Sequence, residues 1–184
     1  YLYLYLKIIP YGIHRNPITE DVLYDALWRI YVRDIDESKV NKEKVLQLLD
    51  VMTENMYKRQ ELSINRREIE TIYIEELRYL LSRELVQLTQ NGRVQFFHQT
   101  MFDYVYARRF VEKGHNLLEE LSSQHQGLFS RAAVKSVLTF LREADTARYV
   151  QAINSLLYDK KENGSDKFRF HLKSLALSNM TFFD

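Results

Sequence analysis

Glycine and proline are scarce in this chain, and that scarcity limits the folds open to it more than any other feature. The 184 residues include 5 Gly and 2 Pro. A strand-rich fold reverses direction often, and its tight turns draw heavily on these two residues. We therefore expect a mainly α fold with a small β-hairpin.

Apolar residues recur at helical spacing along the first third of the chain. From Thr19, an expected N-cap, one amphipathic helix extends to about Arg33. A second helix begins after Asn41, which is also an expected N-cap. Its inner face is predicted to comprise Val45, Leu48, Leu49, Met52 and Met56.

The middle of the chain has the element order of a winged helix. An extended segment at 62–64 is followed by two short helices at 66–72 and 75–83, and then by two strand-like runs around Asn91-Gly92. Asn-Gly between apolar runs indicates a hairpin, because both residues tolerate the positive φ of a type I′ turn. A long helix at 99–113 is appended to this wing.

Beyond Gly114 the pattern is helical throughout. Antiparallel amphipathic helices joined by short polar turns predict the first pairs of a HEAT-like array. The expected inner faces of three successive helices comprise Ala133, Val134, Val137, Leu138 and Leu141, then Tyr149, Val150, Ile153, Leu156 and Leu157, then Phe168, Leu172, Leu175 and Leu177.

Charge and residue types argue against several classes of function. Lys and Arg number 26 against 25 acidic residues, and a formal charge of +1 does not favour a general nucleic-acid or membrane-surface protein. The chain has no cysteine, which excludes disulfides and thiolate zinc sites and fits a cytoplasmic location. The apolar start at 1–13 is too short for a membrane span. Since the chain begins within a hydrophobic run and does not start with Met, we expect it to be a piece of a longer protein.

DNA binding is the first function that a winged helix suggests, but the charges disfavour it. The helix that would enter the major groove is slightly acidic and would be repelled by phosphates. The expected wing tip adds only Arg93. The charged residues of that helix are Glu75, Glu76, Arg78, Arg83 and Glu84.

Catalysis by these residues alone is not expected. The sequence has no glycine-rich phosphate loop and no histidine spacing typical of a metal site. Glu68, Glu70, Glu75 and Glu76 are interpreted as a solvated helix face, with an acid/base pair or a metal site as the alternative. We predict no catalytic residue and no metal site here.

His98 is the candidate functional residue. It stands between an expected buried strand and an expected buried helix face, so we expect a buried imidazole that needs a hydrogen-bond partner. That partner could be nearby backbone or a ligand. Tyr104 and Tyr106 are interpreted as core residues, and Arg108 and Arg109 as cations placed favourably near a helix C-terminus.

The segment around His98, "FFHQTMFDYVYARRF", resembles the winged-helix signature of NACHT-type STAND ATPases, the signalling NTPases that include NOD-like receptors and bacterial relatives. The matching positions are Phe96, His98, Phe102, Asp103, Tyr104, Ala107 and Arg108. Many members carry Gln and Glu where this chain has Phe102 and Asp103, so no role is carried over to those two. The flanks resemble the family's first helical subdomain and, after Arg131, its superhelical region.

The resemblance implies three parts: 1–38 as the end of a helical subdomain, 39–114 as a winged-helix domain with an appended long helix, and 115–184 as the start of a helical-repeat domain. The fragment would be a regulatory part of a defence or signal-transduction protein and not an enzyme. The phosphate loop and the acidic metal-binding residues of the parent ATPase would lie upstream.

The resemblance also implies a role for His98. In the family, the winged-helix histidine contacts the β-phosphate of ADP and holds the protein closed. The fragment would carry no cofactor itself, while the parent would bind ATP or ADP with Mg²⁺. Its partners would be its own upstream nucleotide-binding domain, a protein ligand of the helical array and, on activation, further copies of itself. We expect no membrane partner. The alternatives are a winged-helix adaptor that binds DNA or protein, and a plain helical scaffold.

Overall fold

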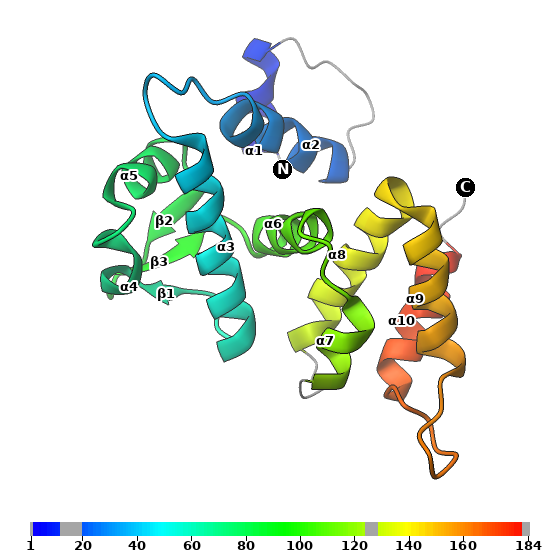
Figure 1. Ribbon diagram of the computed structural model, residues 1–184. Helices are drawn as coiled ribbons and strands as arrows, with labels where there is room; N and C mark the ends of the chain where they lie inside the picture. Colours follow the sequence, from blue (N-terminus) through cyan, green and yellow to red (C-terminus); the bar gives the residue numbers. More distant parts are fainter. Residues whose placement is uncertain (1, 12–19, 124–128, 182–184) are drawn as a thin grey trace. The chain divides into compact units, whose positions relative to one another are not determined.

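The computed structural model describes residues 2–11, 20–123 and 129–181 (Figure 1). Their fold is mainly helical with one small antiparallel sheet, which confirms the expectation drawn from the scarcity of glycine and proline. Contacts divide the chain into two compact units, residues 1–102 and 103–184, and each is described by itself. The three-part division at 38 and 114 stays a prediction.

The first unit opens with two helices. Its elements are α1 (Leu2–Ile8), the 3₁₀ turn η1 (Ile9–Tyr11), α2 (Glu20–Trp28) and the π-helical turn η2 (Arg29–Arg33). The predicted helix that ends near Arg33 is confirmed, whereas the predicted cap Thr19 lies outside the described residues. In the described part of the chain, no helix is long and apolar enough to span a bilayer.

Helix α3 (Lys42–Arg59) follows the predicted pattern closely. The Asn41 side chain accepts a hydrogen bond from the Lys44 backbone N–H at 3.0 Å, which confirms Asn41 as the N-cap. The five predicted inner residues are all buried. The helix ends where Gln60 adopts a left-handed φ of 55°.

A three-stranded sheet and two short helices complete the first unit. They are β1 (Ile64–Asn65), α4 (Arg66–Glu70), α5 (Ile74–Ser82), β2 (Val86–Leu88) and β3 (Arg93–Phe96). β3 is the central strand and pairs antiparallel with both neighbours, Ile64 opposite Val94 and Val86 opposite Phe96. Helix α3 packs against α4, α5 and β1 (Figure 1).

The hairpin forms where predicted, but its turn is not type I′. Gly92 has a φ of +69°, whereas Asn91 does not have a positive φ. The Gly92 N–H donates to the Thr89 carbonyl at 2.9 Å and the Thr89 N–H to the Arg93 carbonyl at 2.8 Å. This is a β-turn followed by one left-handed glycine, which matches the strand twist with a single positive φ instead of two.

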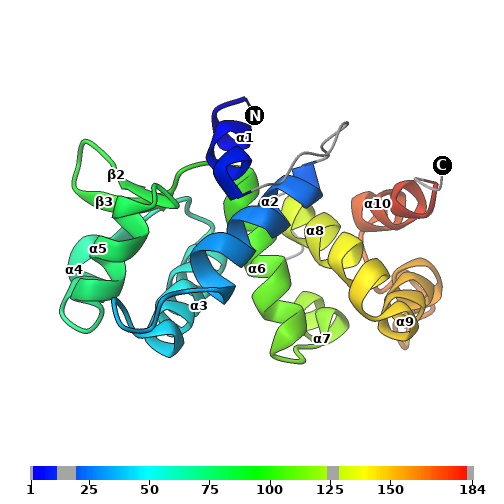
Figure 2. The same ribbon diagram turned by 90° about the horizontal axis from the view of Figure 1, so that it is seen from above.

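The second unit is helical, as predicted. Helix α6 (Gln99–Glu112) begins in the first unit and continues into the second. The second unit also contains α7 (Leu117–Ser123), α8 (Phe129–Ala144), α9 (Thr146–Tyr158) and α10 (Phe170–Met180). Helices α8, α9 and α10 pack against one another and lie side by side in both views (Figures 1 and 2).

Two predicted inner residues of these helices face outward. Val150 is 49% exposed and Leu177 is 54% exposed. The buried stripe of α10 includes Ala176 and Asn179 in place of Leu177, and a small or polar side chain gives no apolar signal in the sequence. The predicted inner face of α8 is buried throughout.

Asn179, which is buried, joins the three helices through a partly buried polar cluster. Its side-chain oxygen accepts a hydrogen bond from the Tyr149 hydroxyl at 3.0 Å, and its amide nitrogen donates to the Thr139 hydroxyl at 3.2 Å. Its backbone carbonyl accepts from Arg142 at 3.3 Å. Residues of α8, α9 and α10 thereby satisfy one another's polar groups.

Candidate functional site

His98 lies at the junction of β3 and α6, as the sequence indicated. Its backbone carbonyl accepts hydrogen bonds from the N–H groups of Met101 at 3.0 Å and Phe102 at 3.3 Å. It therefore stands at the start of a 14-residue helix. The positive end of the helix dipole favours anions at such a position.

The prediction that His98 is buried was wrong, because its side chain is exposed. Strand β3 buries alternate residues, Val94 and Phe96 among them. The strand ends at Phe96, so this alternation no longer applies two residues later. The imidazole is consequently accessible to a partner outside the described residues.

A short hydrogen-bond chain orients the His98 ring. The ring nitrogen Nδ1 pairs with the Thr100 hydroxyl at 2.7 Å and also accepts from the Thr100 backbone N–H at 3.4 Å. The Thr100 hydroxyl in turn pairs with the hydroxyl of Tyr24, a residue of α2 that is 2% exposed. Helix α2 is thereby linked to the β3–α6 junction.

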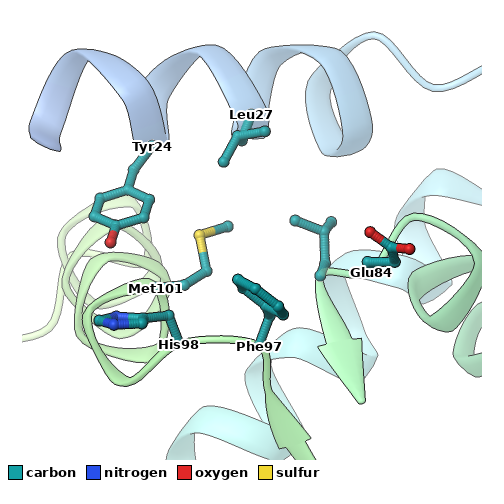
Figure 3. Close-up of a pocket in the computed structure, with 7 residues that line it drawn as sticks. Tyr24, Leu27, Glu84, Phe97, His98 and Met101 are labelled. Carbon is teal, nitrogen blue, oxygen red and sulfur yellow. The ribbon is translucent and has the colours of Figure 1, made fainter. Parts of the chain in front are cut away.

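The hollow beside this chain of hydrogen bonds is small. Its volume is about 10 Å³, room for about one water molecule. Figure 3 shows Tyr24 and Leu27 reaching from α2 toward Met101, with His98 and Phe97 on the junction below. A nucleotide does not fit inside, so a phosphate that contacts His98 would have to meet the exposed part of the ring.

Tyr24 and Thr100 were not singled out from the sequence. Thr100 carried a weak signal, since a threonine two residues after a junction histidine can bond locally. Tyr24 carried none, because it lies 76 residues from Thr100 and is indistinguishable from an ordinary core aromatic.

The aromatic residues of the matching segment form part of the core. The rings of Phe96 and Phe102 pack with centroids 6.0 Å apart at an interplanar angle of 52°. Tyr104 and Tyr106 are buried, which confirms their interpretation as core residues. Asp103 is also buried, and burial raises the pKa of its carboxyl group to about 6.

The two arginines of the segment are held by side chains of their own helix. Arg108 donates to the Tyr104 hydroxyl at 2.7 Å and to Glu112 at 2.9 Å. Arg109 pairs with the other oxygen of Glu112 at 2.8 Å. Both cations therefore lie near the carboxyl end of α6, in agreement with their interpretation as helix-terminal charges.

Three of the four carboxylates considered for catalysis pair with arginines. Glu68 pairs with Arg59 at 2.7 Å, an interaction that lowers the pKa of Glu68, and Glu75 pairs with Arg78 at 2.9 Å. Glu70 pairs with Arg66. Among the described residues, no group of three or more potential metal ligands occurs.

Glu76 contradicts the interpretation of these carboxylates as a solvated face. It is 5% exposed and shares the buried face of α5 with Leu77 and Leu80. It occupies the first turn of α5, where the helix dipole favours a carboxylate. The helical spacing alone did not distinguish this inner position from its exposed neighbour Glu75.

Comparison with known proteins returned no relative. No protein-family model matches the chain, and neither the curated proteins nor the solved structures contain a match.

Proposed function

We propose that this chain is the regulatory middle of a STAND-type signalling NTPase: the end of a helical subdomain, a winged helix and the start of a HEAT-like array. It holds the ADP-bound state closed by donating a hydrogen bond from His98 to a phosphate of the nucleotide. One observation carries the proposal: the matching segment presents an exposed, hydrogen-bonded histidine at the N-terminus of α6.

The local chemistry supports a phosphate partner. An imidazole N–H is a good donor to a phosphate oxygen, and a charged acceptor shortens and strengthens the bond. The helix N-terminus adds a favourable field. Because the hollow beside His98 holds about 10 Å³, the nucleotide and its Mg²⁺ would be supplied by an upstream nucleotide-binding domain.

The element order supports the winged-helix assignment. The sequence α3, β1, α4, α5, β2, β3 ends in a hairpin, and β1 pairs with the far edge of β3. The packed helices α8, α9 and α10 support a HEAT-like start in the second unit. Exchange of ADP for ATP would release His98 and allow opening and self-assembly, a two-state change driven by nucleotide.

The test uses the parent protein with its upstream segment restored. We expect His98→Ala to lose co-purifying ADP, with ADP affinity weaker by roughly ten- to a hundredfold, as for one hydrogen bond to a charged group. Because the ring is exposed, the melting temperature should change little. The measurements are nucleotide content by chromatography, ADP affinity by calorimetry and a melting curve.

Two further variants sharpen this test. His115→Ala removes another exposed histidine, which follows the other end of α6 in the sequence, and should retain ADP. His98→Gln keeps a terminal N–H donor and should retain part of the affinity. Equal ADP in wild type and His98→Ala would refute the latch, and lower thermal stability as the sole change would favour the plain scaffold.

The DNA-binding alternative finds little support in the charges of the first unit. Arg59, Arg66 and Arg78 each pair with a glutamate. Arg93, the cation expected at the wing tip, pairs with Glu61 and also donates to Ser63. Cations already paired with carboxylates contribute less to phosphate binding, because a competing anion must be displaced.

A further inference from the structure

We infer that Thr100 is a positioning residue for His98: together with Tyr24 it holds the imidazole in the tautomer whose hydrogen is on Nε2. The role of that hydrogen, donation to a nucleotide phosphate, rests on the proposed function. The tautomer itself is inferred from the contacts of Thr100 with His98 and Tyr24, all within the first unit.

The Thr100 backbone N–H indicates the direction of the hydrogen bonds, and the closer Thr100 hydroxyl contributes most of the preference. A backbone N–H can only donate, so its contact with Nδ1 at 3.4 Å favours Nδ1 as the acceptor. The Thr100 hydroxyl then donates its hydrogen to Nδ1 at 2.7 Å. Its oxygen is left to accept from the Tyr24 hydroxyl.

The reverse arrangement is less favourable. If Nδ1 carried the hydrogen, it would donate to the Thr100 hydroxyl, which would donate to Tyr24. The Thr100 backbone N–H would then face another N–H, which is a repulsive contact. Only the first arrangement gives the Thr100 backbone N–H an acceptor at Nδ1, and it leaves Nε2 protonated in a neutral ring.

Tyr24 makes this arrangement depend on α2. Its side chain is 2% exposed and lies beside Leu27 and Met101 at the hollow, so packing fixes the position of its hydroxyl (Figure 3). Any displacement of α2 would withdraw that donor from Thr100 and free its hydroxyl to rotate. The orientation of His98 is thus coupled to the position of a helix whose Tyr24 lies 76 residues before Thr100 in the sequence.

The first test is nitrogen NMR of the 184-residue chain labelled with ¹⁵N-histidine, with the His98 signals assigned by their loss in His98→Ala. At a pH where the ring is neutral, we expect Nδ1 to resonate as the unprotonated nitrogen and Nε2 as the protonated one. In Thr100→Val, which keeps the shape and the backbone N–H contact but removes the closer hydroxyl contact, the two shifts should move part of the way toward each other. Thr100→Ser should restore the wild-type pattern.

Tyr24→Phe gives an independent check, because it removes one hydroxyl and leaves the packing. It should weaken the preference for the tautomer protonated on Nε2 less than Thr100→Val does, since Thr100 still donates to Nδ1. Protonated Nδ1 in wild type would overturn the inference. Identical His98 shifts in wild type and a folded Thr100→Val would also overturn it.

The second test measures ADP retention by the parent protein and separates the inference from the proposed function. We expect Thr100→Val to weaken ADP binding about tenfold, as for loss of one hydrogen bond, and Thr100→Ser to bind normally. Loss of ADP in His98→Ala with wild-type affinity in Thr100→Val would sustain the latch and reject positioning by Thr100. The expected NMR shifts with ADP unaffected by either variant would sustain the positioning and reject the latch.

Discussion

Asp103 is a buried residue whose ionisation should cost the fold stability. Burial raises its pKa from 3.8 to about 6. The native state therefore holds a proton between about pH 4 and 6 that the unfolded state has lost, so stability falls as pH rises through that window. A shift of this size corresponds to roughly 2–3 kcal/mol of destabilisation above pH 6.

We expect Asp103→Asn to remove this penalty. The variant should be more stable than wild type by roughly 2–3 kcal/mol at pH 8 and by little at pH 4. Urea unfolding at both pH values measures the difference. Asp34→Asn, which changes an exposed carboxyl group, is the matched control and should have a small effect at pH 8. An equal effect of Asp103→Asn at both pH values would contradict the assignment to ionisation.

At the scale of single residues, the sequence predicted where His98 lies along the chain but not which residues contact it. Its place between a strand and a helix followed from local pattern. The exposure of its side chain did not follow from local pattern, because this exposure depends on where β3 ends. Its link to Tyr24 depends on a contact between residues 24 and 100, which no local pattern reveals.

At the scale of single elements, most predictions held because each helix is specified by its own residues. Helix α3 has a cap at one end and a continuous apolar stripe. The hairpin also formed where the sequence placed it. Its turn type was wrong because Asn-Gly permits several turns, and hydrogen bonds to Thr89 and Arg93 select among them.

Asn41 gives a direct test at this scale. Its side chain satisfies one of the first N–H groups of α3, so Asn41→Ala should lower the free energy of unfolding by about 1 kcal/mol. Asn41→Asp keeps the acceptor and should be close to wild type. Gln47→Ala, an exposed change within the same helix, should be neutral or slightly stabilising. Urea unfolding of the four proteins provides the comparison, and an unchanged Asn41→Ala would show that the cap contributes nothing.

For the whole molecule, near-balanced charge predicts poor nucleic-acid binding. The formal charge is +1, and the cations of the first unit considered above are paired with glutamates. We expect a labelled DNA duplex of about 20 base pairs to bind no more tightly than ~10 μM at physiological salt, within the non-specific range. Fluorescence anisotropy over a salt series measures this. Submicromolar binding that weakens steeply with salt would instead support the DNA-binding adaptor.

The polar cluster around Asn179 limits which substitutions this chain can accept during evolution. Helices with aliphatic inner faces can pack in more than one register, because one leucine substitutes readily for another. Asn179 limits that freedom, since Tyr149 and Thr139 find their partners in a single alignment of α8, α9 and α10. Replacement of one of these residues by an apolar one leaves a buried polar atom of its neighbour without a hydrogen-bond partner. Descendants of this chain should therefore replace Tyr149 and Asn179 together or keep both.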